Sequence, residues 1–151
     1  MTNILENTLV MVVLAALILI PVVIVKRSNR KKKQELLQNK LDSITADNNC
    51  KLTRTGSIGN LLLAFSDKRK LILLNLIDFT YELIDLEKVI SVKEEISYNG
   101  KEVRNVMLLL SFANGAKKEI VLYKQYDSSE SELPSAKKMA KEWVLLLAVP
   151  A

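Results

Sequence analysis

The feature that most constrains this chain is a run of seventeen uncharged residues near its start, Leu9 to Val25. Thirteen of them are Leu, Ile or Val, and each favours insertion into a bilayer by about 0.3 to 0.6 kcal/mol, or roughly 4 to 8 kcal/mol together. As an α-helix the run would rise about 26 Å, close to a hydrocarbon thickness of about 30 Å. The sequence therefore predicts one transmembrane helix, which Pro21 bends locally near its basic end.

Two other interpretations of the apolar run are weaker. A buried helix of a soluble domain needs cover on every side, and a chain of 151 residues has little material to supply it. A cleaved signal peptide carries positive residues before its apolar core and small residues at a cleavage site after it, and this sequence has neither. We therefore expect the helix to act as a permanent anchor.

Six basic residues follow the apolar run at once, whereas the eight residues before it contain no Lys or Arg. The six are Lys26, Arg27, Arg30, Lys31, Lys32 and Lys33. By the positive-inside rule, this asymmetry predicts a single-pass protein of the cell membrane with its N-terminus outside and its C-terminal domain in the cytoplasm. Each basic residue can gain about 1 kcal/mol from anionic lipid headgroups, so the cluster either recruits lipid or only fixes the topology.

Charge divides the chain into three segments. Residues 1 to 25 carry one Glu, residues 26 to 50 carry seven basic and three acidic residues, and residues 51 to 151 carry fifteen basic and thirteen acidic residues. We interpret these segments as the N-terminal segment with its transmembrane helix, a basic juxtamembrane linker and a cytoplasmic domain. Because the domain is nearly neutral, it lacks the one-sided positive surface that nucleic-acid binding requires.

Residues that commonly carry chemistry are scarce. The chain has no histidine, the commonest general base and zinc ligand, and its single cysteine, Cys50, forms no internal disulfide. The acidic residues between Asp78 and Glu95 fit no calcium loop. The segment from Gly56 to Gly59 lacks the Lys-Ser or Lys-Thr of a phosphate-binding loop, which leaves a turn as its interpretation. The sequence therefore predicts no catalytic residue, no metal site and no cofactor.

From Lys51 onward, short apolar runs alternate with turn signals, which is typical of an antiparallel β domain. Asn99-Gly100 and Asn114-Gly115 predict two tight hairpins, because Asn-Gly readily adopts positive φ angles. One run shows period-two alternation and predicts a half-buried strand with Ile90, Val92, Ile96 and Tyr98 on its apolar face. The predicted strands are residues 51 to 55, 61 to 65, 70 to 76, 79 to 85, 89 to 98, 103 to 112 and 117 to 124.

The hydrophobic period becomes helical after residue 132. Pro134 fits the first turn of an amphipathic helix of about 14 residues. Its polar side carries Lys137, Lys138, Lys141 and Glu142, and its apolar side carries Ala136, Ala140, Trp143 and Leu147. This helix is too short to span a bilayer, so we expect it to pack on the sheet with Trp143 in the core.

Seven short strands closed by one amphipathic helix resemble the pleckstrin-homology-like (PH-like) fold found in small bacterial proteins with an N-terminal membrane helix. The resemblance covers about residues 51 to 149 and is closest in Lys70 to Leu83 (KLILLNLIDFTYEL), in Glu87 to Tyr98 (EKVISVKEEISY) and in the closing helix. It implies a mainly β (α+β) domain, built as a bent antiparallel sheet or open barrel of about seven strands capped by the helix. It also implies a binding module and not an enzyme.

The phosphoinositide-binding members of that family carry basic residues where an early strand turns into the next. The nearest match in this chain is Lys68, Arg69 and Lys70. The following strand, Leu71 to Leu76, contains no basic residue, so the resemblance does not carry over a lipid specificity. These three cations are either an anionic-lipid contact or the solvated tip of a turn.

We therefore expect a non-enzymatic, membrane-tethered interaction module that presents a PH-like domain to a protein partner or to anionic lipid headgroups. The alternative is a small structural or accessory subunit of a membrane complex, in which the transmembrane helix makes the main contacts. That helix has neither an intramembrane charge nor a G-x-x-x-G motif, which weakens the alternative.

Overall fold

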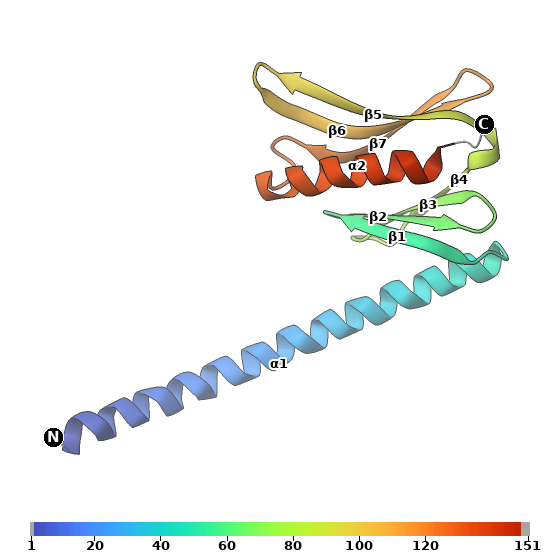
Figure 1. The fold of residues 1–151 in the computed structure, drawn as a ribbon. Coiled ribbons are helices and arrows are strands. Elements are labelled where there is room, and N and C mark those ends of the chain that lie inside the picture. Colours follow the sequence, from blue (N-terminus) through green and yellow to red (C-terminus); the bar gives the residue numbers. More distant parts are fainter. Residues whose placement is uncertain (1, 149–151) are drawn as a thin grey trace. The chain divides into compact units, whose positions relative to one another are not determined.

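The computed structural model describes residues 2 to 148, and its contacts divide the chain into two compact units with a boundary between Ile44 and Thr45. Residue 1 is the first of the predicted N-terminal segment, and residues 149 to 151 are the last of the predicted domain. These four residues lie outside the described residues. Figure 1 shows one long N-terminal helix and a β-rich region that ends in a second helix.

Helix α1 (Thr2–Asp47) is continuous and contains both the predicted anchor and most of the predicted linker. The helix continues through Pro21 without a break. The large apolar side chains between Val10 and Val25 are 49 to 70% exposed. By length and composition, one helix of the described chain, residues 10 to 47, is able to cross a membrane.

The second unit contains two open antiparallel sheets (Figure 1). The first sheet has the order β1 (Leu52–Ile58), β2 (Leu61–Ser66), β3 (Lys70–Asn75) and β4 (Tyr81–Asp85). The second sheet has the order β5 (Val89–Asn99), β6 (Glu102–Phe112) and β7 (Lys117–Lys124). Among residues 2 to 148 no ladder joins the two sheets, so they do not close into a barrel. The remaining elements are two 3-10 helices, η1 (Leu86–Lys88) and η2 (Glu130–Glu132), and the helix α2 (Leu133–Leu147).

The seven predicted strands and the two Asn-Gly hairpins are confirmed, with Gly100 and Gly115 at φ angles of 62° and 83°. The turn predicted over Gly56 to Gly59 is wrong in its first part, because β1 continues to Ile58 and only Gly59 and Asn60 form the turn. Gly56 instead has a role in the packing of α2 against β1. A Cβ atom at Gly56 would lie 3.1 Å from Nε1 of Trp143, so glycine allows α2 to approach β1 closely.

The predicted apolar face of β5 is confirmed only in its middle. Val92 and Ile96 pack against the core, whereas Ile90 and Tyr98 are 62% and 60% exposed. The ladder between β5 and β6 has irregularities next to both ends of this stretch, between Val89 and Ser91 and between Ser97 and Tyr98. Each irregularity shifts the alternation by one residue, which turns the flanking side chains to the other face.

Helix α2 packs between the two sheets and completes the core (Figure 1). All four residues of its predicted apolar side are buried: Ala136, Ala140, Trp143 and Leu147. Trp143 is 2% exposed and joins core residues of both sheets, such as Leu71 of β3 and Leu108 of β6. Because no ladder connects the sheets, this shared apolar contact holds them against each other.

We predict that Trp143→Ala will lower the free energy of unfolding by about 3 to 5 kcal/mol, because it leaves a large cavity between the sheets. Lys138→Ala changes an exposed side chain of the same helix and should alter that free energy by no more than about 0.5 kcal/mol. Denaturant melts of the full chain in detergent, followed by circular dichroism at the β signal, measure both changes. Equal stability of the two variants, by circular dichroism, would contradict the core position of Trp143.

Candidate functional site

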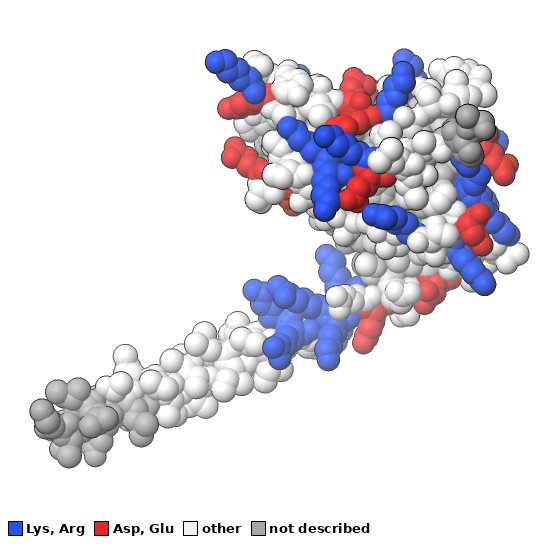
Figure 2. Space-filling view, in the orientation of Figure 1, with Lys and Arg blue, Asp and Glu red and all other residues white. Residues whose placement is uncertain are grey.

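The first set of candidate residues forms a basic collar on α1, defined as Lys26, Arg27, Arg30, Lys31, Lys32 and Lys33. All six residues are exposed. Successive residues of an α-helix are rotated by about 100°, so these six side chains leave the helix in directions spread around most of its circumference. Figure 2 shows them as one group of blue side chains next to the white apolar part of the helix.

The second set, Lys68, Arg69 and Lys70, lies in and next to the turn between β2 and β3. Only Lys68 is exposed, and Arg69 and Lys70 are half-buried. The backbones of Arg69 and Lys70 stabilise the turn. The carbonyl of Arg69 accepts a hydrogen bond from the Leu86 amide (2.9 Å). The Lys70 amide donates to Oγ of the buried Ser66 (3.2 Å). These contacts give the turn a structural role and leave one exposed cation, Lys68, at its tip.

The described residues contain no group of three or more side chains with the His, Cys, Asp or Glu ligands that could hold a metal ion. Cys50 is 7% exposed and lies three residues beyond the end of α1, where its thiol has little access to solvent. The described residues therefore offer neither a metal site nor an accessible thiol.

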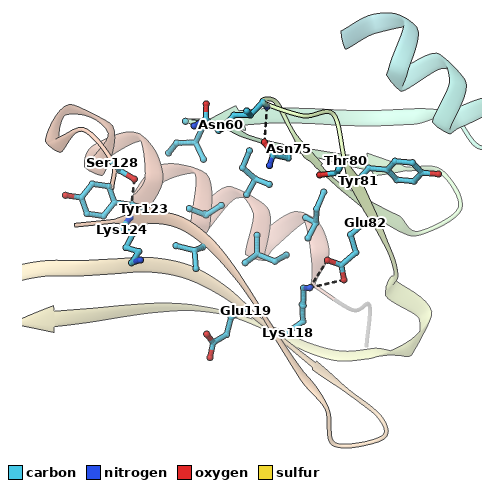
Figure 3. Close-up of a pocket in the computed structure, with 18 residues that line it drawn as sticks. Asn60, Asn75, Thr80, Tyr81, Glu82, Lys118, Glu119, Tyr123, Lys124 and Ser128 are labelled. Carbon is cyan, nitrogen blue, oxygen red and sulfur yellow. Dashed lines mark hydrogen bonds and ion pairs between the residues drawn. The ribbon is translucent and has the colours of Figure 1, made fainter. Parts of the chain in front are cut away.

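A groove of about 560 Å³ lies between the two sheets, and we call it the edge groove (Figure 3). Four segments line it: the β1–β2 turn, the end of β3, the β3–β4 turn with the start of β4, and β7 with Ser128 beyond it. All four belong to the compact second unit. The groove therefore arises from the two sheets themselves.

One wall of the edge groove is the outer edge of β7. Seven consecutive residues of this strand, from Lys118 to Lys124, line the groove. Successive side chains of a strand point to opposite faces of the sheet. A cavity that is lined by every residue of a run therefore contacts the backbone edge of the strand. Among the described residues β7 pairs with β6 alone, and β4 on the opposite side pairs with β3 alone. Two unpaired strand edges thus border one groove.

Polar contacts close the edge groove at both ends (Figure 3). At one end, Nζ of Lys118 on β7 lies 2.6 Å from Oε2 of Glu82 on β4. At the other end, the Lys124 amide donates to Oγ of Ser128 (3.3 Å), and the Lys124 carbonyl accepts from the Ser128 amide (3.0 Å). The unpaired edge between these contacts runs from Glu119 to Tyr123, a length of about 16 Å.

The floor of the edge groove is apolar and continuous with the core. Ile58, Ile120 and Leu122 are buried there, and Leu61 and Leu73 pack beside them. The rim exposes further apolar surface, because Ile77, Tyr81 and Val121 are 70%, 42% and 43% exposed.

The charges near the groove are already paired. Glu82 pairs with Lys118, and Lys124 pairs with Asp127 at 2.7 Å. Glu119, the remaining charged lining residue, points away from the groove in Figure 3. The edge groove consequently offers apolar contacts and backbone hydrogen bonds with little net charge.

The rim between β3 and β4 is a turn held by short-range hydrogen bonds. Oδ1 of Asp78 accepts from Oγ1 of Thr80 (2.8 Å) and from the Thr80 amide (3.1 Å). The side-chain hydrogen bond from Thr80, and then the bond from its amide, lower the pKa of Asp78 below its ordinary value of 3.8. Phe79 between them has a φ of 57°, a conformation that is rare for a bulky residue. The turn thus holds Ile77 and Tyr81 at the groove.

Both basic sets can be identified in the sequence, whereas the edge groove cannot. The groove depends on β4 and β7 coming together, and the Glu82–Lys118 contact joins residues that are 36 positions apart. No local pattern encodes such an approach. A partial signal exists in β7, where the apolar Val121 falls on the face that alternation assigns to polar residues such as Glu119.

No protein-family model, no curated protein and no solved structure matches this chain.

We predict that Thr80→Val will raise the pKa of Asp78 towards 3.8, because the substitution removes the hydroxyl donor. Since this pKa is lower in the folded chain than in the unfolded chain, the ionised Asp78 stabilises the fold above pH 3.8. That contribution is lost as the pH falls through the folded pKa. Carboxyl-detected NMR titration of the full chain measures the pKa, and Thr53→Val, which removes a hydroxyl from β1, is the control. An unchanged Asp78 pKa in Thr80→Val would contradict the assigned cause.

Proposed function

We propose that this chain is a single-pass membrane protein that tethers a non-enzymatic binding domain of PH-like architecture to the cytoplasmic face of the cell membrane. The observation that carries the proposal is on α1, where an exposed apolar stretch is followed at once by the basic collar. Contiguous apolar surface of this extent is rare on soluble proteins, and a bilayer is the environment that removes it from water.

The basic collar supports the proposed depth of the helix. From Lys26 to Lys33 the helix rises about 10 Å, which is enough to cross the polar headgroup region on one side of a bilayer, about 5 to 8 Å thick. Cations directed around the helix reach anionic headgroups whichever way the helix is rotated. The same cations favour the cytoplasmic side, where they remain during insertion.

The second unit supports the proposed binding role. Its seven strands and packed C-terminal helix match the number of strands and the closing helix that the PH-like resemblance implies, although the strands form two sheets of four and three and not one bent sheet. It has its own core, and its edge groove has a volume typical of ligand sites. The chain also contains no histidine, which favours binding over catalysis. A tether confines such a domain to the membrane surface and raises its effective concentration there.

The edge groove favours a protein partner over lipid as the ligand of the domain, because its charges are paired and its floor is apolar. The turn between β2 and β3 adds one exposed cation, Lys68, so we assign anionic-lipid contacts chiefly to the basic collar. The rival function, an accessory subunit that acts through its transmembrane helix, gives the edge groove no role.

The predicted topology is testable with a single exposed thiol. Cys50 is a poor reporter because it is 7% exposed, whereas Tyr126 is 87% exposed. In a chain carrying Cys50→Ala and Tyr126→Cys, we expect a membrane-impermeant maleimide to label intact cells only after the membrane is opened. As a control, changing all six collar residues to Gln should remove the bias and produce labelling from outside in part of the molecules. Full labelling of the chain with an intact collar in unopened cells would contradict the proposed orientation.

A further inference from the structure

We infer that the edge groove binds an extended, uncharged segment of a partner protein, which adds as a short β-strand along β7. The inference rests on the proposed function, because it names the partner of the same tethered domain. It starts from the unpaired edge of β7 between Glu119 and Tyr123, which is open to the groove. Such an edge presents a row of backbone donors and acceptors that an extended chain can pair with.

The geometry of the groove selects an extended chain over a helix or a compact ligand. The contacts at Lys118 and Lys124 close the edge at both ends, so the open stretch accepts about five residues of a strand. Alternate side chains of an added strand would face the apolar floor near Ile120 and Leu122. The intervening side chains would face solvent and the exposed rim residues Ile77 and Tyr81. The groove thus fits a segment with apolar residues at every second position.

Charge complementarity selects an uncharged segment. Glu82 and Lys118 neutralise each other at one end, and Lys124 and Asp127 do so at the other. Anionic lipid and nucleic acid would find no unpaired cation in the groove. A second copy of this chain, paired antiparallel along the whole of β7, would have to displace the contacts of Lys118 and Lys124 that close the edge, and it would then place Lys117 opposite Lys124 at both ends of the pairing. Like charges that face each other across strands are destabilising, so the occupant we assign is a different, uncharged segment.

The bulge in β7 sets the length of regular pairing. The ladder between β6 and β7 is irregular between Val106 and Met107, where Leu122 is the extra residue. Bulges and terminal lysines protect strand edges from indiscriminate pairing, and β7 has both. They leave Glu119 to Val121 as the regular part of the open edge. A partner strand therefore gains specificity from the few side chains it places in the groove.

The test uses peptides selected from a phage-displayed library of random nonapeptides against the full chain in lipid nanodiscs. We expect the selected peptides to carry alternating apolar residues and to slow amide hydrogen exchange between Glu119 and Tyr123. N-methylation of single peptide residues supplies the sharper readout. In strand addition alternate peptide amides donate to β7, so binding should be lost at every second methylated position and retained at the positions between.

Two matched variants locate the site. Val121→Asp places a carboxylate at the edge groove, and Ile90→Asp places one on β5, at a position that does not line the groove. Both positions are exposed, so the denaturant midpoints of the two variants should match that of the parent. Val121→Asp should weaken peptide binding by about tenfold or more, because the bound strand would cover an unpaired charge. Ile90→Asp should leave binding unchanged.

The outcomes separate the inference from the proposed function. Peptides that bind Val121→Asp as tightly as the parent, or that lack the period-two response to N-methylation, would overturn the inference and leave a binding domain with another site. Dimers of the chain that Val121→Asp dissociates would replace the partner segment with a second copy, which also overturns it. A library without binders contradicts strand addition and favours the accessory-subunit function. Failure of the chain to enter nanodiscs would instead contradict the membrane anchor.

Discussion

The apolar surface of α1 has to be removed from water, and the organisation of the remaining chain follows from this constraint. A helix that is apolar on all sides from Leu9 to Val25 needs apolar surroundings in every direction, which a bilayer supplies. The basic collar directly after this stretch would place charge where the headgroups begin. The proposed bilayer contact covers the whole apolar surface of the anchor, so none of that surface is left to complete the core of the domain. The domain therefore has to form its core from its own residues.

That core is closed by one helix between two sheets. The sheets share no ladder among the described residues, so their contact depends on side chains, and Trp143 supplies the largest of these. Gly56 allows Trp143 to lie against β1. A sandwich completed in this way still has unpaired strand edges at β4 and β7. The Glu82–Lys118 pair and the Ser128 turn cover the ends of the opening between them, and the edge groove remains.

Elements whose signals are local could be predicted from the sequence. The period-two runs and the Asn-Gly pairs located the seven strands, and the helical spacing of Ala136, Ala140, Trp143 and Leu147 located the buried side of α2. The exposure of Ile90 could not be predicted, because it follows from a change of register that alternation does not show. The role of Gly56 required knowledge of what packs against it. The basic sets were found because their charges are adjacent in sequence, whereas the edge groove was missed because β4 and β7 meet only in the fold.

We propose that α1 crosses the bilayer and leaves it at the basic collar, and spin labels that report depth in the membrane test this placement. Single cysteines placed in turn at each position from Val10 to Lys33, with Cys50→Ala, carry nitroxide labels in vesicles. We predict that collisions with dissolved oxygen exceed those with a water-soluble nickel chelate from Val10 to Val25, and that the order reverses between Lys26 and Lys33. Nickel collisions that dominate throughout, or that alternate with the period of a helix lying on the surface, would contradict a membrane-spanning α1.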